Sequence, residues 1–291
     1  MTTRIPHALA VLATLAFAHA AAAETPLERG AYLINSIVAC GNCHTPQGPD
    51  GPVPGMELAG GLRIEEAPFT AYTANLTPDP ATGIGRWSDA EIVTAIREGR
   101  RPDGTLIGPP MPFHFYRGMS DGDAMAIVAY LRQVKPVVNP VPKSEFRMPL
   151  PVSWGPPVGS VPDVPRSDAA KYAEYVTGPL GHCMDCHTPR LSDGRLDMTR
   201  WGAGGLPLNG PWGVSVSRNV TADPDDGLGK WTDAQIKAAI TSGVRPDGAR
   251  LAPPMAYHYY RNIRDEDLTA LVAYLRTLPP LKGPVAMGAS K

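Results

Sequence analysis

The feature that most constrains this chain is a five-residue pattern, Cys-x-x-Cys-His, that occurs twice. It begins at Cys40 as Cys-Gly-Asn-Cys-His and at Cys183 as Cys-Met-Asp-Cys-His. This order is typical of covalent c-type haem attachment, in which both thiols form thioethers and the histidine binds the iron. The chain has 4 cysteines, and the two patterns use all of them. The sequence therefore predicts two covalent haems, attached at Cys40, Cys43, Cys183 and Cys186.

Two disulfides or a zinc knuckle are the alternatives for these cysteines. A zinc site would require further ligands at paired spacing. A thioredoxin-like redox pair would not require the histidine and would lie in a βαβ pattern. The haem interpretation is favoured because it accounts for the order of all five residues.

Composition limits the class of protein. The chain has 291 residues, enough for two domains, with 43% hydrophobic and 19% charged residues, as in a globular soluble protein. A formal net charge of −1 gives no support to nucleic-acid binding. The 33 prolines and 30 glycines indicate long ordered loops and few strands.

The N-terminus has the features of a secretory signal peptide. Arg4 and His7 form a short basic region, and the apolar run over 8–18 is too short to span a bilayer. Small residues then lead to a predicted cleavage after Ala23. We expect residues 1–23 to be removed on export to the periplasm; a retained N-terminal anchor is the alternative. No second apolar run of spanning length follows.

The remainder of the chain is an internal duplication. The segment 83–90 returns at 227–234, and Pro109-Pro110-Met111 returns as Pro253-Pro254-Met255, so the offset is 144; it is 143 at the two haem motifs. A period this long indicates a duplicated domain rather than a solenoid. We predict one domain over 24–135, a linker over 136–166 and a second domain over 167–291.

Each half has the same order of expected helices. Their predicted ranges are 26–38, 89–98 and 121–133 in the first half, and 168–177, 233–241 and 265–277 in the second. The pairs Ser88 with Glu91 and Thr232 with Gln235 are capping boxes, which specify where the middle helices begin.

The linker is rich in proline, with nine in residues 136–165. Such a stretch cannot form a helix or a central strand, and it is expected to be an extended, semi-rigid connector. Phe146 and Trp154 favour its packing across both domains; a loose tether is the alternative.

The iron ligands must repeat because the halves repeat. His44 and His187 are the expected proximal ligands. Met111 and Met255 are the favoured distal ligands, since each follows two prolines that stiffen the loop around a weak thioether ligand. His114 and His258 also repeat and are the rival distal ligands, and an open iron site is the third possibility. Ligation by His and Met raises the reduction potential and fills all six positions, which is typical of an electron carrier.

Two further pairs of repeated residues are candidates for contact with haem. Trp87 and Trp231 are expected to lie against the haem pockets or to serve as ordinary core residues. Arg101 and Arg245 are expected to pair with haem propionates, or to be solvated loop residues. No nucleophile–base arrangement or phosphate-binding loop is present in the sequence.

These motifs resemble the class I cytochrome c family in its dihaem form. The runs that carry the resemblance are Asn75-Leu76-Thr77, Gly83 to Ala90 and Pro109 to His114, with their repeats. The resemblance implies an all-α fold of two tandem domains with long Gly/Pro-rich loops, each wrapped around one haem. It also implies the axial pairs His44 with Met111 and His187 with Met255.

The same runs look like the cytochrome subunits of periplasmic dehydrogenases, among them quinoprotein alcohol dehydrogenases and molybdenum hydroxylases acting on N-heterocycles. Such subunits take electrons from the dehydrogenase and pass them to a cytochrome, quinone or oxidase. A dihaem enzyme, such as a cytochrome c peroxidase or a thiosulfate-oxidising enzyme, is the alternative. It would require different distal residues in the two halves, whereas the candidate distal residues are the same in both. The loops after the haem motifs, 47–56 and 190–201, do differ, and that difference could separate the two haem potentials.

Overall fold

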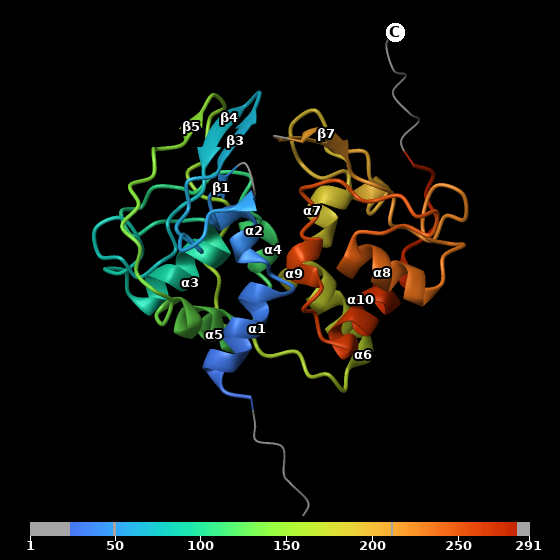
Figure 1. The fold of residues 1–291 in the computed structure, drawn as a ribbon, viewed down its shortest axis with the longest axis horizontal. Coiled ribbons are helices and arrows are strands. Elements are labelled where there is room, and N and C mark those ends of the chain that lie inside the picture. The colour runs from blue at the N-terminus through green and yellow to red at the C-terminus, as the bar shows by residue number, and fades with distance from the viewer. Residues whose placement is uncertain (1–23, 49–50, 211, 284–291) are drawn as a thin grey trace, which may run out of the picture.

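The computed structural model describes residues 24–48, 51–210 and 212–283, which form two lobes with the same order of α-helices (Figure 1). The predicted signal peptide, 1–23, lies outside the described residues. The first half contains α1 (Pro26–Asn35), α2 (Cys40–His44), β1 (Gln47–Gly48), β2 (Gly51–Pro52), β3 (Arg63–Glu66), β4 (Phe69–Tyr72), α3 (Asp89–Glu98), α4 (Phe113–Tyr116) and α5 (Asp121–Leu131). The connector contains β5 (Glu145–Phe146). The second half contains α6 (Ala169–Tyr175), the π-helical turn η1 (Val176–Leu180), α7 (Cys183–His187), the 3₁₀ turn η2 (Met198–Arg200), β6 (Pro207–Gly210), β7 (Gly213–Val216), α8 (Asp233–Ser242), α9 (Tyr257–Tyr260) and α10 (Asp265–Thr277).

Local signals fix the middle helices. The Ser88 side chain accepts from the Glu91 N–H while Glu91 accepts from the Ser88 N–H, and Thr232 and Gln235 repeat this capping box. Helix α3 has the predicted bounds, and α8 extends one residue further. Helix α1 ends three residues earlier than predicted, because the chain must turn before Ala39, which has a φ of 51°.

One apolar core runs through both halves. In the first half α1 crosses α5 so closely that a Cβ at Gly30 would lie 1.9 Å from the carbonyl oxygen of Ala126. Leu33 of α1 and Ile127 of α5 are fully buried in a cluster that continues to Leu180 and Leu275 of the second half, among others. The two halves are therefore joined by packed side chains as well as by the connector.

The fold is mostly helical, as predicted, with three small antiparallel sheets that the sequence analysis did not anticipate. These are β1 with β2, β3 with β4 and β5, and β6 with β7. The hairpins β3–β4 and β6–β7 have equivalent registers, Arg63 opposite Tyr72 and Pro207 opposite Val216. They form because the long glycine-rich loop after each haem motif folds back on itself.

The connector is packed, as expected: most of it lies on the first half, and its end reaches the second half. The Trp154 indole donates to the Ile107 carbonyl oxygen at 2.8 Å, and its ring lies 4.9 Å from that of Phe113. Strand β5 pairs with β4 of the same half. At the end of the connector, Arg166 reaches the second half and pairs with Asp267 at 2.8 Å. The open edge of β4 attracts the connector because it offers unpaired backbone groups.

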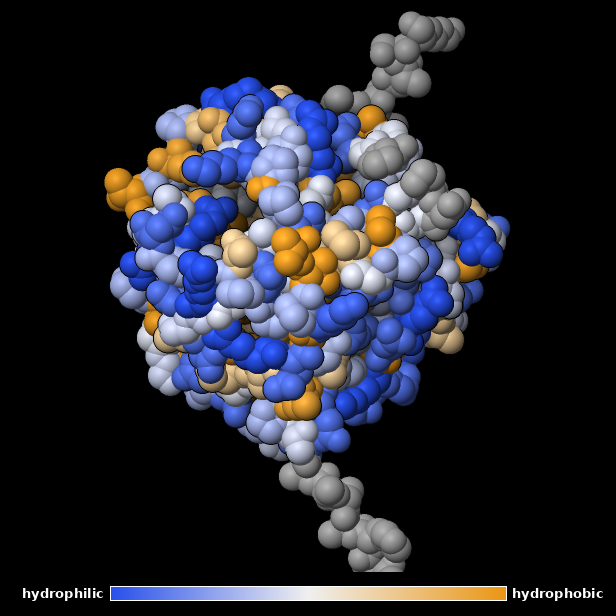
Figure 2. Space-filling view, turned by 60° about the vertical axis from the view of Figure 1, so that its left-hand side comes forward, coloured by the Kyte–Doolittle hydropathy of each residue, from blue (hydrophilic) through white to orange (hydrophobic). Residues whose placement is uncertain are grey.

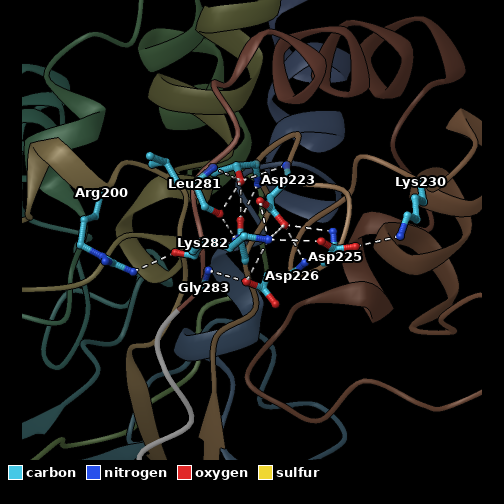
Figure 3. Close-up of polar contacts among 10 residues, drawn as sticks. Arg200, Asp223, Asp225, Asp226, Lys230, Leu281, Lys282 and Gly283 are labelled. Atoms are coloured by element: carbon cyan, nitrogen blue, oxygen red, sulfur yellow. Dashed lines mark hydrogen bonds and ion pairs between the residues drawn. The ribbon is translucent and has the colours of Figure 1, made fainter.

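The segment after each final helix returns to its own half in the same way. The Leu281 N–H donates to Thr221 at 3.2 Å and its carbonyl accepts from Asn219 at 2.6 Å; Val137 bonds equivalently in the first half. Figure 3 shows Lys282 among the carboxylates that surround this segment. The Lys282 ammonium lies 3.3 Å from the carboxylates of Asp223 and Asp225. Ion pairs of an exposed lysine of this kind contribute little to stability.

Hydrophobic residues are scattered among hydrophilic ones on the face in Figure 2. Within the described ranges, no helix is long and apolar enough to cross a bilayer.

Two buried carboxylates join the halves reciprocally. The Tyr32 hydroxyl of the first half donates to Asp267 of the second at 2.6 Å. The Tyr175 hydroxyl of the second half donates to Asp123 of the first at 2.7 Å. The tyrosines are 143 residues apart and the aspartates 144, so the two contacts are equivalent under the repeat. Burial, followed by the bond to Asp267, raises the pKa of Tyr32.

We predict that Tyr32→Phe and Tyr175→Phe each lower the free energy of unfolding by about 1.5–3 kcal/mol, the usual range for a hydrogen bond to a charged group. Chemical denaturation of the haem-loaded protein would measure this. Tyr72→Phe is the matched control, because its hydroxyl makes no hydrogen bond within the described residues. A loss no larger than that of the control would show that these bonds do not stabilise the join.

Candidate haem-binding site

The two Cys-x-x-Cys-His motifs form the short helices α2 and α7 near the centre of the molecule (Figure 1). Each helix follows a residue with positive φ, Ala39 at 51° and His182 at 39°. All four cysteines are free thiols, which gives no support to the disulfide alternative. Within the described residues no group of three or more His, Cys, Asp or Glu side chains is placed to hold a metal ion, as a zinc knuckle would require.

The four thiols are neutral at physiological pH. Burial raises the pKa of Cys40, Cys183 and Cys186 to about 12 and that of Cys43 to about 11. After burial, the electrostatic influence of Asp185 and then of Cys43 also raises the pKa of Cys186. The chain segments that lead into the two motifs lie close together, since a Cβ at Gly181 would be 3.1 Å from Cδ1 of Ile37.

The two motif histidines are held in the same orientation. His44 Nδ1 lies 2.7 Å from the Ala74 carbonyl oxygen, and His187 Nδ1 lies 2.6 Å from that of Arg218. A carbonyl only accepts, so each ring carries its proton on Nδ1 and keeps the Nε2 lone pair for a metal. Burial lowers the pKa of both histidines, and the carbonyl bond opposes this only in part.

The candidate distal ligands separate by environment. Met111 and Met255 are partly buried and pack against the shared core. By contrast, His114 and His258 are exposed, and their rings contact Asp185 and Arg261 respectively. Burial against the core supports methionine over histidine as the distal ligand.

The candidate tryptophans and arginines occupy equivalent places in the two halves. Trp87 and Trp231 are partly buried against the core, and their carbonyls accept from Arg132 and Arg276. The other candidate pair bonds within its own turn. Arg101 donates to the Leu106 carbonyl at 2.7 Å, and Arg245 pairs with Asp247 at 3.1 Å. Their contact with haem propionates stays a prediction.

Sequence reasoning missed the residues at which each motif contacts the other half. Asn42 bonds to Pro254, and Asp185 pairs with His114. The Tyr116 ring also meets that of His182 edge-on, with centroids 5.6 Å apart. The signal in the sequence was a polar residue at the third position of both motifs.

The residues fit covalent haem c. Neutral, unpaired thiols precede a histidine whose Nδ1 is already bonded, and a partly buried methionine follows in each half. When bound, the haem supplies an iron centre that exchanges one electron at a time. The protein contributes the attachment, the proximal imidazole and the surroundings of the iron.

Comparisons with known proteins agree with this donor set. The Cytochrome c family matches over residues 180–279. The chain is 34% identical to the cytochrome c subunit of the quinone alcohol dehydrogenase of Gluconacetobacter polyoxogenes, over 94% of this chain and 60% of that protein. It is 32% identical to a nicotinate dehydrogenase subunit of Pseudomonas putida, over 87% of this chain and 21% of that protein. A diheme cytochrome c-type protein of Cereibacter sphaeroides is 30% identical, over 84% of this chain and 83% of that protein.

This chain belongs to the cytochrome c family. Members of the family carry covalent haem c, which agrees with the attachment residues described above. The chain spans about three fifths of the length of the alcohol dehydrogenase subunit that it matches.

We predict that removing either pair of cysteines halves the haem content. Cys40→Ala with Cys43→Ala, and Cys183→Ala with Cys186→Ala, should each leave one covalent haem per chain, since each motif attaches its own. The haem-to-protein ratio of the denatured chain measures this. An unchanged ratio in either variant would contradict attachment at that motif.

Proposed function

We propose that this chain is a periplasmic dihaem cytochrome that takes electrons singly from a dehydrogenase and passes them to a downstream cytochrome, quinone or oxidase. In this proposal residues 24–135 and 167–291 are tandem class I cytochrome c domains joined by the linker 136–166. The signal peptide 1–23 directs export. The axial pairs are His44 with Met111 and His187 with Met255.

One observation supports this proposal above all: a complete donor set occurs twice, at equivalent positions of the repeat. Each set has two thiols, an oriented imidazole and a partly buried methionine after two prolines. An enzyme that reacts at one haem requires an open or distinct distal position there. The equivalence of the two halves therefore favours two closed sites and a carrier.

The relatives suggest the kind of donor. The named alcohol and nicotinate dehydrogenases use subunits similar to this chain along most of its length. By that similarity the electron donor is a dehydrogenase, either bound to this chain or meeting it transiently. The close approach of the two motifs supports electron exchange between the two haems within one molecule.

We predict that the ferric protein shows the weak long-wavelength band of sulfur-to-iron charge transfer, with intensity for two methionine-bound haems per chain. Met111→Leu and Met255→Leu should each remove about half of that intensity, because in each variant one iron loses its methionine sulfur ligand. Met119→Leu is the matched control, since Met119 is fully buried but has no methionine at the equivalent position, which is Ile263.

A high-spin band in the unmodified protein would contradict the closed-site proposal and favour the dihaem enzyme. Two separable midpoints in a redox titration would support different potentials for the two haems, and one merged midpoint would oppose that hypothesis.

A further inference from the structure

The third residue of each haem motif contacts the half of the molecule to which it does not belong. The Asn42 side-chain amide donates to the carbonyl oxygen of Pro254 at 3.1 Å. The Asp185 carboxylate lies 3.3 Å from Nε2 of His114. Both partners are in the distal-methionine region, since Pro254 directly precedes Met255 and His114 follows Met111 by three residues.

The loop before Met255 has few backbone groups that could form hydrogen bonds. Pro253 and Pro254 have no backbone N–H, so this stretch is fixed only by its carbonyl oxygens and by side-chain packing. After the methionine, the Tyr257 N–H donates to the Met255 carbonyl at 3.0 Å. The bond from Asn42 is the matching polar anchor on the other side of Met255, and it comes from the first half.

The first motif also packs tightly against the helix that follows this loop. A Cβ at Gly41 would lie 2.2 Å from the hydroxyl oxygen of Tyr259, so a larger residue there would displace the Tyr259 side chain. The position of α2 is therefore linked to the position of the Met255 loop by one hydrogen bond and one close contact.

We propose that Asn42 is a positioning residue for Met255, so that the attachment motif of the first haem helps to set the axial bond of the second. This inference rests on the proposed axial pair of His187 with Met255. A methionine thioether is a weak ligand whose occupancy depends on the loop that carries it. The reduction potential of a haem depends on its axial ligand and on the hydrogen bonds around it.

The reciprocal contact is chemically different. An ionised carboxylate accepts but cannot donate, so Asp185 cannot bond to a proline carbonyl as Asn42 does. It accepts instead from Arg190 Nη2 at 2.6 Å in its own half and faces His114 in the other. Asp185 thus reaches the region of Met111 only through a residue three positions further along. We expect the influence to be stronger from the first motif on Met255 than from the second motif on Met111.

The test is Asn42→Leu in the haem-loaded, full-length protein. Leucine keeps approximately the side-chain volume and removes the amide donor. In NMR spectra of the reduced protein, the methyl resonance of each axial methionine reports on its own loop. The resonance that disappears in Met255→Leu is assigned to Met255. We expect Asn42→Leu to shift or broaden the Met255 resonance. We also expect it to lower the equilibrium constant for reduction of one haem by up to tenfold, which corresponds to a fall of 59 mV in its midpoint potential for one electron.

Asn35→Ala is the matched control. Its amide donates to the Ala31 carbonyl and to the Tyr130 hydroxyl, both in the first half. It should leave both methyl resonances and both midpoints unchanged. A change in Asn42→Leu confined to the Met111 resonance, or no change in either resonance, would overturn the inference.

Failure of the proposed ligation gives a different result. If the unmodified protein lacks a shifted methyl resonance that disappears in Met255→Leu, then Met255 is not an axial ligand and the proposed function fails at that point. If that resonance is present and is insensitive to Asn42→Leu, the ligation stands and only the positioning role of Asn42 is rejected.

Discussion

The structure depends on the burial of two carboxylates where its halves meet. Asp267 is 1% exposed. Its carboxylate accepts hydrogen bonds from the hydroxyls of Tyr32 and Tyr172, both at 2.6 Å, and from the guanidinium of Arg166 at 2.8 Å. A buried carboxylate without such partners would cost several kcal/mol. Because one partner of each aspartate comes from the opposite half, separating the halves would leave both carboxylates short of a donor.

The same constraint is met by different residues on the two sides. In the first half Arg29 forms a two-bond pair with Asp123, at 2.7 and 2.9 Å, and Tyr175 completes it. The repeat places Tyr172 at the position of Arg29, so in the second half the positive charge comes from Arg166 of the connector. The geometry of the join is thus repeated, although the arginine that pairs with each aspartate comes from a different position in each half. In the second half that arginine belongs to the end of the connector.

The parts of the fold that were predictable from the sequence are those fixed by local interactions. Helices α3 and α10 have their predicted bounds, and α3 carries a capping box at its start. The π-helical turn η1, which contains Pro179, was not predicted, because a proline inside a helical segment argues against continued helix. The contact of Tyr32 with Asp267 joins residues far apart in the chain, and no spacing rule reports it. The duplication was the only indication that equivalent residues would meet reciprocally.

The residues of the candidate site also fall into those that local sequence predicts and those that depend on the fold. The attachment cysteines and proximal histidines are recognised from five consecutive residues, so the sequence was sufficient to predict them. The carbonyls that orient the histidines, at Ala74 and Arg218, lie about thirty residues further along and are backbone atoms without a sequence signature. The contact of Asn42 with Pro254 depends on the position of one half against the other. Any effect of the first motif on the second haem therefore arises from the assembled pair of halves, since an isolated second half would lack the donor that anchors its own methionine loop.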